Sequence, residues 1–378
     1  MIINLKDIEQ EITRVFEYLH ENPETSWKEY NTTKYIAEFL REQGISVRTF
    51  DNIPGLIAEI GEGSPMVAVR ADMDALWQEV DGTFKANHSC GHDAHMAIVC
   101  GVAMALKGIT PPPKGTVRFI FQPAEEKGTG ALHLVEEGVV DDVNYLYGIH
   151  LRPIQELEDG KAVPSIIHGA AKIMQGKITA DDAHAARPHL GKNAIEVGAQ
   201  MITMLNSIHL NPMESYSVKM TSFHAGGESA NIIPGSATFS IDLRAQRNEV
   251  MDELTEKVEQ IAGSLQSYYN IGIELTETAS IAAAQVHEEA QAFMEKAIIH
   301  VIGEANLREP LITTGGDDFH FYTIKRPHLK AAMLGLGCGL APGLHHPKMT
   351  FNKDAMINGV KILSEVVINT LEERAEQR

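Results

Sequence analysis

Basic residues are scarce in this chain of 378 residues, which has 32 Lys and Arg against 51 Asp and Glu and a net charge of −19 at pH 7. A nucleic-acid or anionic-membrane binder needs a basic face, so we expect neither kind of partner. Three cysteines are too few for a disulfide framework, and an odd number cannot all be paired within one chain. No apolar run approaches the ~18–20 residues of a membrane span, and the N-terminus lacks the apolar core of a signal peptide. We therefore expect a reduced cytoplasmic protein.

Apolar patterning divides the chain into two domains. Apolar runs of strand length first alternate with helical patterns, which predicts an α/β domain around a largely buried sheet. The pattern changes near residue 170 to a compact α+β unit, in which 216–223 and 231–244 are predicted strands. We expect one α/β domain over 1–170 and 283–378 and an inserted α+β domain over 171–282.

The densest polar cluster is HSCGHDAHM (88–96). Its potential ligands or supporting groups are His88, Cys90, His92, Asp93 and His95. Cysteine, histidine and carboxylate side chains bind zinc and neighbouring first-row metals. A surface loop with a helix cap would explain one or two of these groups but not all five, so the cluster favours a metal site.

Further polar clusters follow apolar strands. RADMDAL (70–76) places Asp72 and Asp74 on the same side of a continuing strand. QPAEE (122–126) offers two adjacent carboxylates, of which one could coordinate a metal while the other takes a proton from water. His150 ends the predicted strand 144–150, and His345 follows a glycine-rich loop. Because strand ends of an open α/β sheet meet at one edge, we expect these clusters to converge.

Taken in order, RADMDAL, HSCGHDAHM, QPAEE, GIHLRP and GLHHP resemble the motifs of the M20 metallopeptidase/amidohydrolase superfamily. The branch is the one that contains N-acyl-amino-acid amidohydrolases, hippurate hydrolases and auxin-conjugate hydrolases. The resemblance implies a zinc-peptidase-like α/β catalytic domain, an inserted lid or dimerisation domain, and one or two divalent metal ions (Zn, Mn, Co or Ni). The implied metal ligands are Cys90, His92, Glu126, His150 and His345. Glu125 is the implied general base, and Asp74 the acid that orients a ligand.

The inserted domain carries matching motifs in HAARPHLGKNAI (184–195) and GGESANIIPG (226–235). They imply that His184 polarises the substrate, that Asn231 binds it, and that Arg244 holds its carboxylate. Inserted domains of this family often pair, so the resemblance also implies a homodimer in which His184 serves the partner's site. A histidine that serves its own subunit is the alternative. Asp72 stands where other branches have a ligand histidine, so its role stays open.

The implied activity is metal-dependent hydrolysis of the amide bond of small N-acyl amino acids or related conjugates. One alternative is a dipeptidase or aminopeptidase, in which Asp317 or Asp318 would face the free α-amino group. Another is a non-catalytic metal-binding protein that kept the fold. The chain departs from the family at Asp181–Ala183 and at GGDDF (315–319), which leaves the acyl and amino-acid specificity open. We expect Cys100 to be buried and inert and Cys338 to lie in a loop.

Overall fold

The computed structural model describes residues 5–110 and 114–376, which form two compact units. The second unit comprises His168–Ala284 and Thr313–Gly316, and the first unit comprises the remaining described residues. The boundaries expected at residues 171 and 282 fall inside the second unit. Thr313–Gly316, which the sequence analysis places with the first domain, groups with the second unit.

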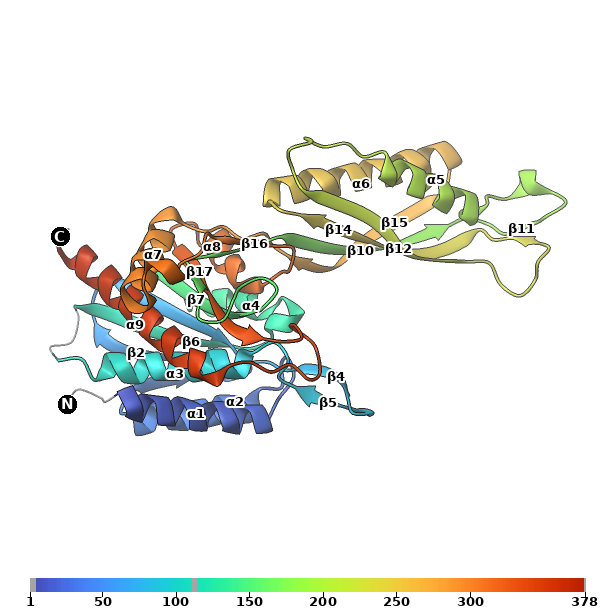
Figure 1. Ribbon diagram of the computed structural model, residues 1–378. Coiled ribbons are helices and arrows are strands. Elements are labelled where there is room, and N and C mark those ends of the chain that lie inside the picture. The colour runs from blue at the N-terminus through green and yellow to red at the C-terminus, as the bar shows by residue number, and fades with distance from the viewer. Residues whose placement is uncertain (1–4, 111–113, 377–378) are drawn as a thin grey trace. The chain divides into compact units, whose positions relative to one another are not determined.

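A seven-stranded mixed sheet forms the centre of the first unit (Figure 1). In spatial order its strands are β1 (Ser46–Thr49), β2 (Leu56–Glu62), β6 (Gly115–Gln122), β3 (Met66–Asp72), β7 (Tyr145–Pro153), β17 (Lys330–Leu340) and β8 (Ala162–Val163). The four strands from β6 to β17 are parallel, whereas β2 and β8 pair with them in the antiparallel sense. The carboxyl ends of the parallel strands therefore share one edge of the sheet.

Both faces of this sheet are covered by helices, so its strands are buried on both sides. Val69 and Phe119 pack into the larger core, while their strand neighbours Ala68 and Ile120 pack into the smaller core on the opposite face. The larger core lies under α1 (Leu5–Glu21), α2 (Tyr30–Glu42), α3 (His92–Lys107), α7 (Glu288–Ile302) and α9 (Met356–Glu376). The smaller core lies under α4 (Gly130–Glu136) and α8 (Phe321–Lys325). Burial on both faces is why these strands are nearly continuous apolar runs in the sequence.

A β-hairpin that the sequence analysis did not predict joins two of the polar motifs. It consists of β4 (Leu76–Val80) and β5 (Thr83–Asn87), connected by Asp81 and Gly82. Both connecting residues have positive φ, 50° and 81°, as a tight two-residue hairpin turn requires. A second small pair is formed by β9 (Ile166–His168) and β16 (Leu311–Thr313).

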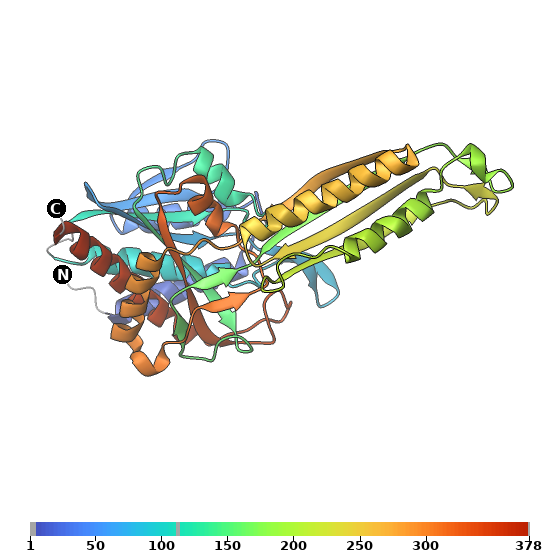
Figure 2. The ribbon, with the colours of Figure 1, turned by 90° about the horizontal axis from the view of Figure 1, so that it is seen from above.

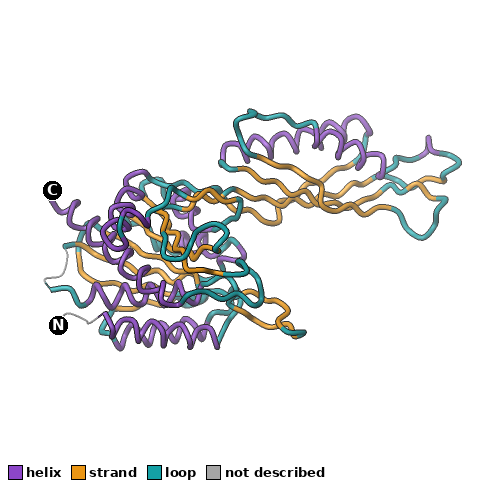
Figure 3. Tube along the Cα trace, viewed as in Figure 1, coloured by secondary structure: helices purple, strands orange, loops and turns teal. Residues whose placement is uncertain are grey.

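The second unit is a four-stranded antiparallel sheet with helices along one face (Figures 2 and 3). Its strands are β12 (Tyr216–Ala225), β14 (Ser236–Ala245), β10 (Ala170–Thr179) and β15 (Gly272–Ile281), and its helices are α5 (Ala194–Asn206) and α6 (Asn248–Tyr269). The single strand predicted over 231–244 is wrong. The chain forms β13 (Ile232–Ile233), which pairs with β11 (Ala183–His184), and then β14. Pro234 lies between them and has no amide to donate to a ladder.

Within the described ranges, no helix combines the length and the apolar character that crossing a bilayer requires.

Candidate metal centre and active site

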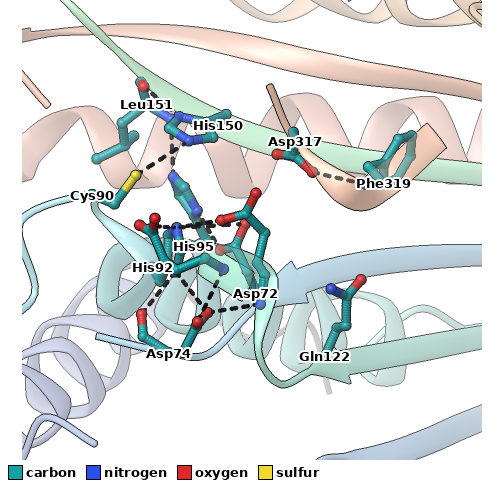
Figure 4. A network of polar contacts seen from close by, with 12 residues as sticks. Asp72, Asp74, Cys90, His92, His95, Gln122, His150, Leu151, Asp317 and Phe319 are labelled. Carbon is teal, nitrogen blue, oxygen red and sulfur yellow. Dashed lines mark hydrogen bonds and ion pairs between the residues drawn. The ribbon is translucent and has the colours of Figure 1, made fainter. Parts of the chain in front are cut away.

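Four of the sequence motifs meet beside the carboxyl ends of β3, β6 and β7, at the start of α3 (Figure 4). Asp72 is the last residue of β3, and Gln122 is the last residue of β6. Gly91, with φ of 90°, lets the chain turn between Cys90 and His92, where α3 begins. His150 does not end its strand as expected, because β7 continues to Pro153 through pairing with β17.

Cys90, His92 and His150 form a buried set whose candidate ligand atoms lie within 4.8 Å of one another. Cys90 Sγ lies 3.7 Å from His150 Nε2. His92 Nδ1 donates to the carbonyl oxygen of Asp74 (2.8 Å), and His150 Nδ1 donates to that of Leu151 (2.7 Å). In its neutral form each histidine therefore presents the lone pair of Nε2 to a ligand, an arrangement typical of metal-binding histidines. His92 Nε2 is buried and has no hydrogen-bond partner among the described residues.

A second set consists of Cys90, Glu126 and His345. His345 Nε2 lies 3.3 Å from Glu126 Oε1, and Glu126 Oε1 lies 3.9 Å from His92 Nε2. The backbone of His345 has φ of 63°, and its amide donates to the carbonyl oxygen of Ser89 (2.6 Å). This hydrogen bond ties the C-terminal histidine loop to the cysteine loop. All five implied metal ligands therefore belong to two ligand sets that share Cys90.

Asp74 holds the turn that carries the two glutamates. Its Oδ1 accepts from the amide of Glu125 (3.1 Å), and its Oδ2 accepts from the amide of Glu126 (3.0 Å) and from Ser26 Oγ (2.6 Å). Oδ1 also lies 3.3 Å from His92 Nδ1. Both oxygens of Asp74 therefore have protein partners, and Asp74 also forms a further buried set of candidate ligand atoms with His92 and Glu125.

Asp72 belongs to a different, fully buried network. Its Oδ2 accepts from Arg70 (2.6 Å) and its Oδ1 from His95 Nδ1 (2.7 Å), while His95 Nε2 accepts from the amide of Leu151 (2.9 Å). Asp72 Oδ2 is also 3.9 Å from His92 Nε2. Each oxygen of Asp72 therefore has a protein donor, and Asp72, His92 and His95 form another buried set of candidate ligand atoms. Arg70 is a site residue that the sequence analysis missed, and a lone arginine in an apolar strand gives little signal.

His88 and Asp93 are buried, but neither belongs to a ligand set within the described ranges. Asp93 accepts from the amide of Ala94 (2.9 Å) and from His20 Nδ1 (2.7 Å). Asp93 is thus engaged at the start of α3 and in an ion pair with α1.

Glu125 lies next to both ligand sets, with Oε2 at 3.8 Å from His92 Nε2. Its carboxylate also lies within 4.8 Å of the carboxylates of Asp317 and Asp318. Burial, and then repulsion from Asp317 and Glu126, raises the pKa of Glu125 well above its usual value. A carboxylate with a raised pKa is suited to accept and return a proton.

Burial and charge also shift the pKa values of the candidate ligands. Burial and then the Glu126 carboxylate raise the pKa of the Cys90 thiol. Burial alone would lower the pKa of His92, but the carboxylate of Asp72 and the neighbouring Cys90 outweigh it and raise that pKa. Burial lowers the pKa of His150, which keeps its ring neutral. A divalent cation would offset the concentrated negative charge and favour the Cys90 thiolate. The site therefore fits one or two divalent metal ions.

The other two cysteines lie apart from these ligand sets. Cys100 is buried in α3, where burial raises the pKa of its thiol, as expected for an inert residue. Cys338 was expected in a loop, but it lies inside β17, because that strand continues to Leu340. Burial raises the pKa of Cys338 to about 12.

The three implied substrate residues lie in the second unit but not all together. His184 pairs with Ile232, and the amide of Ala185 donates to the carbonyl oxygen of Asn231 (2.9 Å), so His184 and Asn231 are neighbours. Arg244 lies near the far end of β14, the strand that follows Asn231. Nine residue steps of 3.3 Å make β14 about 30 Å long. Within one chain, Arg244 is therefore remote from His184 and Asn231.

A family model described as peptidase family M20/M25/M40 matches residues 68–369. An N-acetylcysteine deacetylase of Bacillus subtilis is 30% identical over 381 residues, which cover 94% of this chain and 95% of that protein. An IAA-amino acid hydrolase of Arabidopsis thaliana is 27% identical, with 93% of this chain and 85% of that protein covered. Among solved structures, a dinuclear metal-binding peptidase of the M20 family from Bacillus subtilis matches with a TM-score of 0.83 and 27% identity over 97% of this chain and 99% of that one. The motifs, the fold and these similarities agree, and the chain belongs to peptidase family M20/M25/M40.

Proposed function

We propose that this protein is a metal-dependent amidohydrolase that cleaves the amide bond of N-acyl amino acids or related conjugates. The observation that carries the proposal is the placement of the buried Glu125 carboxylate beside both ligand sets, within 4 Å of Nε2 of His92. The deacetylase and IAA-amino acid hydrolase relatives support the substrate class.

Cys90, His92, Glu126, His150 and His345 would hold the metal. Zinc, manganese, cobalt and nickel all suit a mixed thiolate, imidazole and carboxylate set. When bound, a divalent metal lowers the pKa of water towards ~7 and polarises the substrate carbonyl.

Glu125 would accept the proton of the attacking water and return it to the departing nitrogen. General acid–base assistance of this kind is worth about 10²–10⁴-fold in rate. Asp74 holds the amide of Glu125 while this proton moves. His184 would donate to the carbonyl oxygen as it gains negative charge, and Arg244 would pair with the substrate carboxylate.

The separation of Arg244 from His184 supports a homodimer in which these residues act on one substrate from different subunits. An exposed apolar stripe on α5 supports it further, since Ile195 and Ile202 are 48% and 41% exposed. They lie seven residues apart and so share a helix face. Such a stripe suits contact with a second copy of the chain.

Release of free amine from a panel of N-acyl amino acids, with and without a chelator, tests the activity. We expect turnover that chelation abolishes and added metal restores. Cleavage of dipeptides in preference to acylated substrates would favour the dipeptidase alternative. The specific observation for that alternative is the buried carboxylate of Asp317 beside Glu125. No turnover by metal-loaded protein would favour a binding protein.

Mixing two inactive variants, Glu125→Ala and His184→Ala, tests the shared site. If His184 acts across a dimer, a heterodimer contains one site with both groups intact, and activity returns. If subunit exchange is demonstrated and activity stays absent, His184 serves its own subunit.

A further inference from the structure

Three successive backbone amides in the glutamate turn each donate to a carboxylate. The amide of Ala124 donates to Glu29 Oε1 (2.8 Å), and those of Glu125 and Glu126 donate to the two oxygens of Asp74. Fixing consecutive amides fixes the directions in which the two glutamate side chains leave the backbone. Asp74 belongs to a recognised site motif, whereas Glu29 lies outside every motif of the sequence analysis.

The amide that Glu29 holds belongs to the most constrained residue of this turn. Ala124 has φ of 53° and ψ of 40°, in the left-handed region that residues other than glycine seldom adopt. Such a conformation persists only when the surrounding structure holds it in place. Ala124 is fully buried, and the Glu29 carboxylate is the side-chain acceptor for its amide.

The burial of the Glu29 side chain is energetically unfavourable. It is the N-cap residue of α2, where a polar side chain ordinarily accepts from the first amides of its own helix, but within the described structure it makes no such bond. It is 0% exposed, and its Oε2 has no hydrogen-bond partner in the described part of the chain. Burial, and then the Asp74 carboxylate, raises the pKa of Glu29 to about 8. Burial of a carboxyl group with an unused oxygen opposes folding, and the hydrogen bond to the buried amide of Ala124 is the contact that offsets this cost.

The segment around Glu29 supports the other acceptor as well. Ser26 Oγ donates to Asp74 Oδ2 (2.6 Å), and the carbonyl oxygen of Glu24 accepts from the amide of Ala75 (2.7 Å). Residues 24–29 thus carry one of the two carboxyl groups that hold the glutamate turn and contact the other.

We propose that Glu29 is a positioning residue that fixes Glu125 and Glu126 through the amide of Ala124. The inference rests on the proposed function only for the roles of those two glutamates, since the contact itself is independent of the reaction.

Three variants test this inference. Glu29→Gln keeps an oxygen that can accept from Ala124, whereas Glu29→Ala removes it. Thr33→Val is the matched control, because Thr33 lies in α2, the helix for which Glu29 is the N-cap residue. This variant removes two buried hydrogen bonds, with the amide of Gly55 and with the carbonyl oxygen of Glu29, and leaves the contact to Ala124 in place. For each variant we would measure affinity for Zn²⁺ and Mn²⁺, hydrogen exchange in the peptide covering residues 122–128, kcat and KM, and thermal stability.

We expect Glu29→Ala to lower metal affinity and kcat by about 10–100-fold, the usual effect of removing a group that orients metal ligands. KM should change by less than about threefold, and exchange at 122–128 should accelerate. Glu29→Gln should stay close to the parent in all four measurements, and Thr33→Val should lose only stability. Equal impairment of Glu29→Gln and Glu29→Ala would overturn the inference, as would unchanged metal affinity and exchange in Glu29→Ala. If the parent hydrolyses no substrate, the proposed function is wrong. The measurements of metal affinity and hydrogen exchange still test the positioning role of Glu29 in that case.

Discussion

Arg70→Met should destabilise the first unit far more than loss of a surface ion pair would. Arg70 is completely buried and donates to Asp72 (2.6 Å), Gln122 (2.9 Å) and Asp318 (3.0 Å). Methionine keeps an unbranched apolar stem but leaves the buried carboxyl groups of Asp72, Asp317 and Asp318 without their counter-ion. Removal of one partner of a buried ion pair costs about 3–5 kcal/mol, against roughly 0–1 kcal/mol for an exposed pair. We therefore expect the free energy of unfolding to fall by about 3–5 kcal/mol.

Urea unfolding followed by tryptophan fluorescence measures this loss. Both tryptophans, Trp27 and Trp77, lie in the first unit, so the signal reports on that unit. Arg118→Met is the matched control in the neighbouring strand β6. Its carboxylate partners Glu59 and Asp142 are 38% and 56% exposed, so water can solvate them once the arginine is gone. The control should lose about 1 kcal/mol.

The pH dependence of the Arg70→Met loss provides a second check. Burial raises the pKa of Asp318 to about 7 even though Arg70 opposes that shift. Without Arg70, that pKa rises further. A carboxyl group whose pKa is higher in the folded state than in the unfolded state binds its proton more tightly when folded. The free energy of unfolding therefore falls as the pH rises from about 3.9, the unfolded value, through the folded value. The difference between variant and parent should thus be larger at pH 8 than at pH 6. Equal differences at the two pH values, or a loss no greater than that of Arg118→Met, would refute the reasoning.

Three further predictions follow from the site. Glu125→Gln should keep its metal content while kcat falls by about 10²–10⁴-fold, and Glu126→Gln should lose metal; equal metal loss in elemental analysis would contradict this division of roles. Metal should protect Cys90 from thiol reagents while Cys100 stays unlabelled in the folded protein, and equal labelling of Cys90 with and without metal would argue against ligation. His20→Asn should flatten the pH dependence of urea midpoints. The hydrogen bond to its buried carboxylate partner raises the pKa of His20, so its contribution to stability is complete below about pH 6.5 and is lost as the pH rises through the folded-state value; superimposable profiles would contradict it.

Periodicity and motif order in the sequence were sufficient for the main helices, the central strands and the family. The expected α/β domain contains the helix α3 and the strand β3, which are buried elements with strong apolar signals in the sequence. The hairpin β4–β5 had a readable signal in Asp81–Gly82, the dipeptide that favours a two-residue turn, but its polar strands lack apolar alternation.

The supporting contacts of the site could not be predicted from the sequence. Glu29 and Ala124 are 95 residues apart, and no local pattern links a helix N-cap to a turn at the end of another strand. The same holds for Arg70 and Asp318, which are 248 residues apart. Such pairs depend on strand order in the sheet, and strand order is a property of the whole fold.

The interruption of the first unit by the second has a consequence for synthesis of the chain. β17 pairs with both β7 and β8, yet Lys330 follows the end of β7 by roughly 180 residues. At about 5–20 residues per second, the ribosome leaves that edge of β7 unpaired for roughly 10–35 s. The whole stretch from His168 to Ala284 emerges in this interval and can fold first. His345 emerges after β17, so a nascent chain stalled before residue 330 presents an open sheet edge and an incomplete set of metal ligands.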